Sequence, residues 1–490
     1  MNPQIPTLTR RGFLRQINCA AISSGAALNT MLNLRLANGL AAQGTTGRKA
    51  LVCLFLSGGM DSFNFLVPYD TARYATYSTS RGAFGTTGGL ALNRTTLRPL
   101  VTPLQDYGLH TSCQRIHELA TGTGMFAGKK RLAFVANMGT LVQPITKAQF
   151  KAWEQGSNIT LPVPRSLFSH VDQIEQWQTA VPQGMSQLSG WAGRAADILH
   201  STYNQNRLSM NISLNGNNVL QLGRQVQPFV ITPTGALSFT GDVGGAGINP
   251  VQLKNTAFRS TLEQRYDNLL TESISRMTKS SDAAQLVFQE QFDSVGATLG
   301  AAVDALFPES NPLAVALRTV VKSIKVSNQL GLSRQTFFVN YGGWDHHGEL
   351  LETQRGMLST LDTAIGAFQQ ALELLGMADD VITFTASDFG RTLRANGRGT
   401  DHAWGGNAFV FGGKVDGGRM FGTYPSLALE SSDDIGRGGR LLPTTPVDTY
   451  FAEMLRWFGV PAGDLSYVLP NIGNFYNVSS TVPPLGFVKA

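Results

Sequence analysis

Short apolar segments recur along the chain, and each is followed by glycine or polar residues. The first covers residues 49–56 (KALVCLFL) and ends in Ser57-Gly58-Gly59. Similar segments lie at residues 131–137, 336–340, 381–386 and 408–411. Because these segments are short and mostly do not alternate between apolar and polar positions, they predict strands that are covered on both faces.

Longer segments between these strands carry a helical pattern. Between Met357 and Gly376, apolar residues recur every three or four positions, at Leu358, Leu361, Ala364, Ile365, Phe368, Ala371, Leu372 and Leu375. Such a stripe predicts a helix packed on a core, and the glycine predicts its end. Residues 285–306 and 313–329 are also predicted to be helical. Strands separated by long helices predict an α/β fold, a three-layer α/β/α sandwich around a central mixed sheet.

Residues 205–250 show a different pattern. Three short apolar segments, at 208–214, 219–222 and 228–231, surround Asn215-Gly216-Asn217-Asn218. Short apolar segments around a turn sequence predict strands rather than helices. We therefore expect a β-rich insertion at about 205–250, within a single domain that covers residues 43–490.

The first 42 residues have the character of an export signal. Thr9-Arg10-Arg11-Gly12-Phe13-Leu14-Arg15 resembles the twin-arginine consensus, and a mildly apolar segment follows as far as Leu40. Arg35 and several Asn and Gly make this segment too polar to span a bilayer, so no transmembrane anchor is expected. Cleavage is expected near Ala41. We expect the twin-arginine translocation machinery as a partner and a periplasmic or secreted protein; the alternative is a basic amphipathic N-terminus.

Charge and composition narrow the range of functions. The chain has 490 residues, of which 42% are hydrophobic and 15% charged, and its formal net charge is +6. Four arginines and no acidic residue lie in the leader, so the remaining chain carries +2. No block of basic residues stands outside the leader, and nucleic acid is therefore not an expected partner.

Cysteine usage leaves two possibilities open. Cys19 lies in the leader, whereas Cys53 and Cys113 lie in the expected mature chain. These two could form a disulfide in an oxidising compartment. Cys53 also lies inside an apolar segment, where a free cysteine behaves as a small buried hydrophobe.

Polar clusters follow three of the predicted strands, and three of the seven histidines lie in these clusters. The carboxyl ends of strands are where α/β sheets gather their sites. Carboxylates and imidazoles there are the ligands that a zinc- or manganese-type site needs. The alternative for each residue is a role in a turn or in the core. The residues concerned are Asp61, Asp345, His347, Asp388 and His402.

Several of these motifs together resemble the domain-of-unknown-function 1501 (DUF1501) family over nearly the whole mature chain. Those at the polar clusters are Leu56-Ser57-Gly58-Gly59-Met60-Asp61, Gly343-Trp344-Asp345-His346-His347, Ser387-Asp388-Phe389-Gly390-Arg391-Thr392 and Asp401-His402. Those elsewhere are Asn137-Met138-Gly139-Thr140, Ser169-His170 with Gly190-Trp191, and Pro446-Val447-Asp448 through Trp457-Phe458-Gly459.

That family is similar to the alkaline phosphatase and sulfatase superfamily, which implies metal ligands at the strand ends. By this resemblance Asp61 is the first-strand ligand, and Asp345, His347 and the later His402 belong to one metal site. Asp388 resembles the Asp of the usual Asp-His pair, but Phe389 stands where that pair has its histidine. The resemblance therefore implies one divalent metal ion, with zinc, manganese and calcium as candidates, or none, rather than a two-zinc site.

The same resemblance implies an exported hydrolase-like protein that acts on a phosphate or sulfate ester, with a small ester or a glycan-type substrate. Thr140 and Ser169 are the candidate nucleophiles, although a hydroxyl at such positions more often caps a turn or helix. Arg391 could hold the substrate anion bidentately or form a structural salt bridge. The alternative function is a non-catalytic binding or surface-assembly protein that has kept the fold with a degenerate site.

Overall fold

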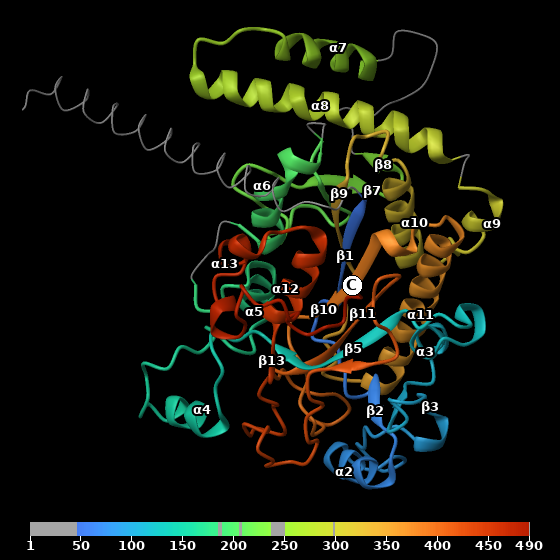
Figure 1. Cartoon of the computed structure of the whole chain (residues 1–490), viewed down its shortest axis with the longest axis vertical. Coiled ribbons are helices and arrows are strands. Elements are labelled where there is room, and N and C mark those ends of the chain that lie inside the picture. Colours follow the sequence, from blue (N-terminus) through green and yellow to red (C-terminus); the bar gives the residue numbers. More distant parts are fainter. Residues whose placement is uncertain (1–46, 185–188, 205–207, 237–249, 297–298, 490) are drawn as a thin grey trace, which may run out of the picture. The chain divides into compact units, whose positions relative to one another are not determined.

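A large sheet forms the centre of the computed structural model (Figure 1), which describes residues 47–184, 189–204, 208–236, 250–296 and 299–489. The leader and its predicted cleavage site lie outside these residues. The described helices are α2 (Thr71–Arg81), α3 (Gln114–Thr121), α4 (Lys147–Glu154), α5 (His170–Thr179), α6 (Trp191–Tyr203), α7 (Pro250–Leu262), α8 (Leu269–Gly296), α9 (Ala301–Asp304), α10 (Pro312–Lys325), α11 (Leu350–Leu374), α12 (Val447–Phe458) and α13 (Leu465–Val468).

Ten strands belong to this sheet, which is mixed. Strand β1 pairs in parallel with β9 on one side and with β10 on the other. Beyond β10, strands β11 and β5 continue the sheet with antiparallel pairing. The strands are β1 (Lys49–Phe55), β5 (Leu132–Gly139), β6 (Asn211–Ser213), β7 (Phe229–Thr232), β8 (Gly235–Ala236), β9 (Arg334–Asn340), β10 (Val381–Ala386), β11 (Gly406–Gly412), β12 (Met420–Phe421) and β13 (Thr445–Pro446), and a separate small sheet holds β2 (Leu66–Pro68), β3 (Arg98–Pro99) and β4 (Tyr107–Leu109).

Two hydrophobic cores lie on opposite faces of this sheet. Alternate residues of β1 divide between them, with Val52 and Leu54 in one core and Leu51 and Cys53 in the other. Helices α3, α10 and α11 contribute to the first core, and α5, α6, α12 and α13 to the second. Because a strand covered on both faces must be apolar at successive positions, this packing explains the unbroken apolar segments. The α/β/α arrangement with a central mixed sheet is confirmed.

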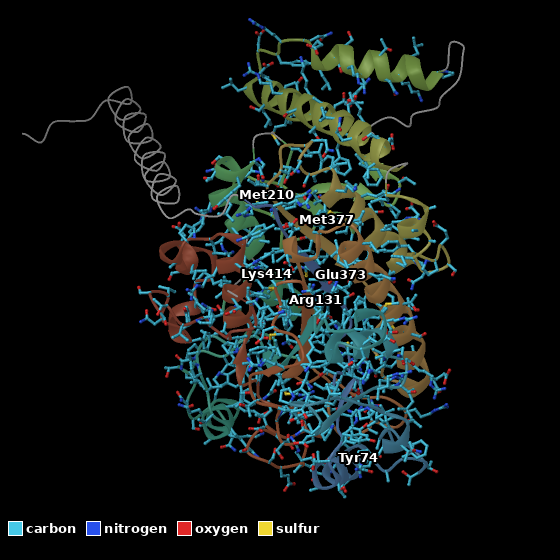
Figure 2. The ribbon with its side chains drawn as sticks, turned by 45° about the vertical axis from the view of Figure 1, so that its right-hand side comes forward. Tyr74, Arg131, Met210, Glu373, Met377 and Lys414 are labelled. Carbon is cyan, nitrogen blue, oxygen red and sulfur yellow. The ribbon has the colours of Figure 1, made fainter. Side chains whose placement is uncertain are left out.

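An ion pair links α11 to the sheet. Arg131 directly precedes β5, and its Nε lies 2.8 Å from Oε1 of Glu373 near the end of α11 (Figure 2). Both side chains are largely buried, with 16% and 14% exposed. The pair therefore links the start of a strand to the end of the helix that covers it.

The five strands predicted outside residues 205–250 are all present, but one predicted helix is interrupted. Residues 285–306 fall in α8, which ends at Gly296, and in α9, which begins at Ala301. Gly300 between them has φ +85°, a left-handed conformation that a helix cannot contain. The prediction of one continuous helix was therefore wrong, whereas the stripe between Met357 and Gly376 lies within α11.

The strands near residues 205–250 join the main sheet. Strand β6 pairs in parallel with β9 and with β7, so these strands extend the sheet at its edge. Residues 219–222, predicted as a strand, form a turn. A tertiary contact holds this turn, because the side-chain oxygen of Gln178 accepts hydrogen bonds from the backbone of Val219 (2.9 Å) and Leu220 (3.1 Å). Residues 237–249 of the expected insertion lie outside the described part.

The two cysteines of the described chain are free and buried. Cys53 lies in β1 and Cys113 precedes α3, and their side chains belong to different cores. Burial raises the pKa of both thiols, which keeps them protonated. Among the described helices, none combines the length and the apolar character that crossing a membrane requires.

Candidate metal site

The loops at one edge of the central sheet bring three histidines and two carboxylates together. Asp345 and His347 follow β9, and Asp388 follows β10. His402 precedes β11, which starts at this edge because it runs antiparallel to β10. His170 reaches the same place as the first residue of α5. The strand order β10-β1-β9 thus gathers residues from distant parts of the chain.

The Nε2 atom of His402 lies close to two other imidazole Nε2 atoms and to one carboxylate, and we call these four side chains the His/Asp cluster: His170, Asp345, His347 and His402. The Nε2 of His402 lies 3.1 Å from that of His170 and 2.9 Å from that of His347. Asp345 Oδ1 lies 3.0 Å from His347 Nε2 and 3.2 Å from His402 Nε2. The ligand atoms of His170, Asp345 and His402 all lie within 4.8 Å of one another, which is the spacing that a metal site needs.

The opposite ring nitrogens of two of these histidines are held by acceptors. His402 Nδ1 lies 2.8 Å from the backbone oxygen of Phe168, and His170 Nδ1 lies 2.6 Å from Asp388 Oδ2. A carbonyl or carboxylate oxygen only accepts, so the partners assign a proton to each Nδ1. In the neutral form of either ring, Nε2 then carries the lone pair and faces the cluster. Burial lowers the pKa of His402, which favours this neutral form.

Asp388 forms a hydrogen bond with His170 and is not a member of the His/Asp cluster. Its side chain is 1% exposed, and its second oxygen accepts a hydrogen bond from the backbone of Gly58 at 3.0 Å. Burial raises the pKa of Asp388, although the hydrogen bonds from His170 and Gly58 oppose this shift. The expectation that Asp388 is itself a ligand is corrected by this placement, because both its oxygens are engaged and it orients the His170 ring.

His170 is the member of the cluster to which the sequence assigned no role. Its ring packs against Phe389, with 4.7 Å between ring centroids, and Phe389 packs against His402 at 4.5 Å. Phe389 therefore contributes an apolar face, while an imidazole comes from α5. Two signals were available in the sequence, namely the scarcity of histidine and the position of His170 within the Ser169-His170 motif.

The buried Arg391 forms an ion pair with Asp345 and holds its carboxylate in place. Its Nη1 lies 2.7 Å from Asp345 Oδ1 and 3.2 Å from the backbone oxygen of Gly58, and its other nitrogens donate to the side chain and backbone of Thr400. The guanidinium is fully buried. Burial opposes ionisation of Asp345, but Arg391 together with His347 and His402 outweighs it, and the pKa of Asp345 is lowered. With its donors engaged, Arg391 positions Asp345 and does not reach out to hold a substrate anion, as the sequence had allowed.

Asp61 lies apart from the His/Asp cluster. Its carboxylate is fully buried and pairs with the guanidinium of Arg81, which is equally buried. It also accepts backbone hydrogen bonds from Phe63 at 3.1 Å and Asn64 at 3.2 Å. The expectation of a first-strand ligand is therefore not met by its placement, because its charge is neutralised by a partner other than a metal.

The two candidate nucleophiles have structural partners. The buried Thr140 donates its hydroxyl to the side-chain oxygen of Gln176 at 2.9 Å. Ser169 is the N-cap residue of α5 and donates to Asp172 Oδ2 at 2.7 Å. Both hydroxyls thus take the capping or packing role that such residues commonly have, and neither has a hydrogen bond to the cluster within the described residues.

Glycine allows the loops to approach each other so closely. Gly58 follows β1 with φ +117°, and a Cβ atom there would lie 2.5 Å from the backbone nitrogen of Asp345. Any side chain at this position would push the loop after β1 away from the loop that carries Asp345. The loop after β1 is also the one whose Gly58 N–H donates to Asp388. Close backbone packing therefore explains Gly58, whereas a Cβ atom at Gly59 would lie 2.6 Å from the ring of Phe389.

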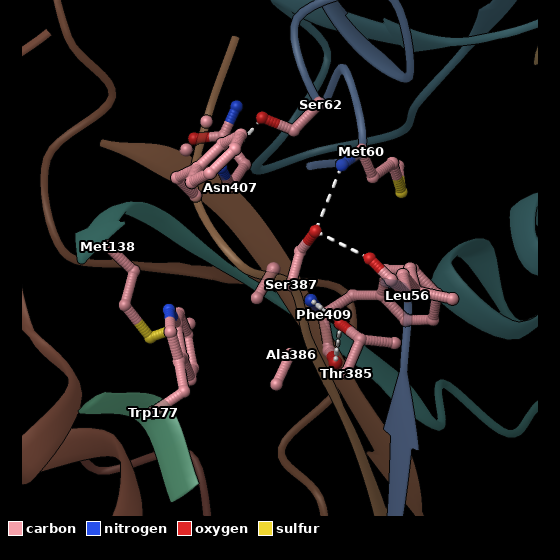
Figure 3. A pocket seen from close by; sticks show the side chains of 14 residues that line it. Leu56, Met60, Ser62, Met138, Trp177, Thr385, Ala386, Ser387, Asn407 and Phe409 are labelled. Carbon is pink, nitrogen blue, oxygen red and sulfur yellow. Dashed lines mark hydrogen bonds between the residues drawn. The ribbon is translucent and has the colours of Figure 1, made fainter. Parts of the chain in front are cut away.

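Behind Phe389 lies a small, mainly apolar cavity of about 30 Å³ (Figure 3). Met138 and Trp177 lie on one side of it, and Ser387, Met60 and Leu56 lie on the other. Ser387 donates to the backbone oxygen of Leu56 at 2.7 Å and accepts from the backbone of Met60 at 2.9 Å. Such a volume holds about one water molecule. The cluster itself is open to solvent, where the side chains of Asp345 and His347 are 43% and 45% exposed.

Residues 48–437 match the family described as "Protein of unknown function (DUF1501)". The chain belongs to this DUF1501 family. The match includes the whole His/Asp cluster together with Asp388 and Arg391, so the cluster lies within the part of the chain that defines the family.

Solved structures show a weaker likeness. Ps i-CgsB in complex with k-i-k-neocarrahexaose has a TM-score of 0.29 and 10% identity, covering 87% of this chain and 72% of that chain. PsFucS1 sulfatase from Pseudoalteromonas sp. has a TM-score of 0.30 and 10% identity, covering 82% and 69%. Likeness at this level implies nothing about activity or substrate. No curated protein matches the chain.

Proposed function

We propose that this DUF1501 protein is an exported hydrolase that binds one divalent metal ion at the His/Asp cluster and acts on a phosphate or sulfate ester. The observation that carries the proposal is the convergence of three imidazole Nε2 atoms and the Asp345 carboxylate, two of the imidazoles being held by their Nδ1 atoms. Export rests on the twin-arginine sequence of the leader.

The spacing of the cluster fits a metal ion. A tetrahedral site with metal–nitrogen distances of 2.0–2.1 Å has edges of about 3.3 Å between ligand atoms. The distances from His402 Nε2 to its three neighbours in the cluster are 2.9, 3.1 and 3.2 Å. Neutral imidazoles whose lone pairs face each other at such distances repel, and a cation between them removes the repulsion. The residues of the His/Asp cluster therefore fit a divalent metal ion.

The chemistry of the ligands favours some metals over others. Three nitrogen ligands and one carboxylate suit zinc or manganese, whereas calcium prefers six to eight oxygen ligands. One ion is supported better than two, since Asp61 is paired with Arg81 and Phe389 offers no ligand atom.

Each residue of the site has a definable task. His170, His347, His402 and Asp345 would hold the ion, and when bound it acts as a Lewis acid toward an ester oxygen. Asp388 and the backbone of Phe168 orient two of the imidazoles, and Arg391 holds Asp345. Thr140 and Ser169 are engaged elsewhere, which favours water over a side-chain hydroxyl as the attacking group.

The rival function is a non-catalytic exported binding or surface-assembly protein. It is favoured by the same engagement of Thr140 and Ser169, and by the burial of Arg391, because these leave the substrate few protein groups at the cluster. The rival retains the metal as a structural or ligand-binding centre. Metal binding and ester turnover therefore have to be measured separately.

Metal binding is tested by elemental analysis of purified mature protein, before and after dialysis against zinc, manganese and calcium. We expect about one ion per chain, and His170→Ala and His402→Ala should each remove most of it. His117→Ala is the matched control, because this histidine contacts Pro99 and lies outside the cluster. Absence of metal from the unsubstituted protein under every condition would overturn the metal site.

Ester turnover is tested with a panel of phosphomonoesters, phosphodiesters and sulfate esters on protein of known metal content. Asp345→Ala should abolish the activity, since it removes the carboxylate of the cluster. Activity that persists in Asp345→Ala indicates a contaminant. Metal-loaded protein that turns over none of the esters contradicts the hydrolase and favours the binding protein.

A further inference from the structure

An open cleft of about 730 Å³ lies beside the His/Asp cluster, at the carboxyl ends of β1 and β9. Six amide side chains line it, and among the described residues no charged side chain does. These amides are Gln178, Asn215, Asn217, Asn218, Gln227 and Asn340. The cleft therefore differs from the neighbouring cluster of histidines and carboxylates, because its polar groups are uncharged amides.

We propose that this amide cleft binds a neutral, polyhydroxylated ligand, namely a segment of an oligosaccharide. The proposal rests on the proposed function for the reaction, because it assigns the sugar part of an ester substrate to the amide cleft and the reacting group to the His/Asp cluster. Binding of the sugar itself does not require the metal.

The hydrogen-bonding groups of the cleft match those of sugar hydroxyls. A hydroxyl both donates and accepts, and an amide side chain offers both kinds of group. Asn217 is exposed on the loop that follows β6, and no hydrogen bond from its side chain is found within the described residues. Asn340 also lines the cleft, and no hydrogen bond of its side-chain amide is found among them. These two asparagines therefore offer unused polar atoms to a ligand.

Other amides hold the walls in place. Asn215 Oδ1 accepts a hydrogen bond from the backbone of Asn340 at 2.7 Å, which links the loop after β6 to the end of β9. Gln178 uses its oxygen to hold the backbone of Val219 and Leu220. The cleft is therefore formed in advance of binding, which lowers the entropic cost of ordering it.

Apolar side chains complete the lining. Phe55 and Phe338 line the cleft with 6.1 Å between ring centroids, and both are almost fully buried. Ile174 and Leu222 also line it and are partly exposed. A sugar ring presents apolar C–H faces between its hydroxyls, so this mixture of amide and apolar surface fits a carbohydrate better than an ionic ligand, for which the described lining offers no counter-charge.

The cleft and the cluster are joined by short connections. Ile174 lies one helical turn after His170 on α5. Ser57, another lining residue, accepts through its backbone oxygen from Gly343 at 3.1 Å and Trp344 at 3.2 Å, directly before Asp345. A chain of two or more sugar units in the cleft can therefore extend to the exposed side of the cluster.

The test is calorimetric titration of metal-free mature protein with neutral hexasaccharides of glucose (α- and β-linked) and of N-acetylglucosamine. We expect at least one to bind with a Kd in the millimolar range or tighter. The double variant Asn217→Ala/Asn340→Ala should weaken it about tenfold, as expected for the loss of two neutral hydrogen bonds. Asn328→Ala is the matched control, since this exposed asparagine follows α10 and precedes β9, away from the cleft.

His402→Ala separates this proposal from the metal site. If the cleft acts as proposed, this variant loses metal but keeps its sugar affinity. Failure of every neutral oligosaccharide to bind, or binding that the double asparagine variant leaves unchanged, overturns the amide cleft and leaves the metal result standing. Tighter binding of sulfated than of neutral chains to metal-free protein would also overturn it, because the proposal requires a neutral ligand.

Discussion

His170 and Asp388 form a hydrogen-bonded pair across the edge of the sheet, with 2.6 Å between Nδ1 and Oδ2, although 218 positions separate them in the sequence. The pair turns the Nε2 of His170 toward His402. A buried carboxylate that orients an imidazole in this way raises the basicity of the ring and fixes its direction. The contact thus gives the aspartate at the end of β10 a positioning role in the proposed metal site.

Replacement of that carboxylate by an amide should weaken metal binding without abolishing it. Asp388→Asn keeps the shape but removes the charge that holds the Nδ1 proton of His170, so we expect a loss of metal affinity of about 10- to 100-fold. The measurement is competition for zinc with a chelating dye. The exposed Asp379→Asn is the control, and an affinity unchanged by Asp388→Asn would contradict the positioning role.

The buried pair between Asp61 and Arg81 should be important for stability. Arg81→Met leaves the Asp61 carboxylate buried without its partner, and we expect a loss of about 3–5 kcal/mol in the free energy of unfolding. Asp61→Asn/Arg81→Met together should cost less than Arg81→Met alone. Chemical denaturation gives both values.

An exposed pair provides the comparison for this result. Arg419 and Asp416 are also an ion pair, at 2.8 Å, but their side chains are 58% and 36% exposed. Arg419→Met should therefore change stability by less than about 1 kcal/mol. Equal effects of Arg81→Met and Arg419→Met would show that burial of the Asp61 pair has no energetic consequence.

Asp448 should make the protein less stable as the pH rises. It is fully buried near the start of α12, and neither carboxylate oxygen has a hydrogen-bond partner in the described residues. Burial raises its pKa to about 8, although its own backbone and Arg194 oppose the shift. Between the unfolded pKa near 4 and pH 8 the folded state keeps a proton that the unfolded state has lost. The stability contribution of this group is therefore complete below about pH 4 and falls as the pH increases to 8.

A neutral replacement tests this pH dependence. Asp448→Asn cannot ionise, so its free energy of unfolding should change less between pH 5 and pH 8, with a difference from the unsubstituted protein on the order of a few kcal/mol at pH 8. Urea denaturation at both pH values is the measurement. Parallel pH profiles for the two proteins would disprove the assignment of the effect to Asp448.

Export should require both arginines of the leader. Replacing Arg10 and Arg11 by lysine keeps the charge but removes the pair that resembles the twin-arginine consensus. We expect the precursor to remain in the cytoplasm, as measured by cell fractionation and immunoblotting. Arg35→Lys, which lies in the same leader, should be exported normally. Undiminished export of the double variant would rule out the twin-arginine route.

The sequence determined the layered architecture because the signals for it are local. A strand buried on both faces must be apolar at consecutive positions, and a helix on a core must be apolar every third or fourth position. Residues 49–56 and 381–386 carry the first pattern, and the segment from Leu358 to Leu375 carries the second. The position of polar residues after the strands also follows from the sequence, and the structure places Asp345, His347 and His402 in loops at one edge of the sheet.

Tertiary structure alone decided which of these polar residues meet. Asp61 and Asp388 follow neighbouring strands, as the sequence indicated, yet one pairs with Arg81 and the other with His170. These partners come from α2 and α5, and their approach depends on strand order and helix packing, which leave no periodic signal in a single chain. The amide cleft has the same origin, because the loop after β6 reaches Asn340 only once β6 has paired with β9. Local patterns encode burial, whereas the contacts that give a carboxylate its role are set by the three-dimensional arrangement of the strands and helices.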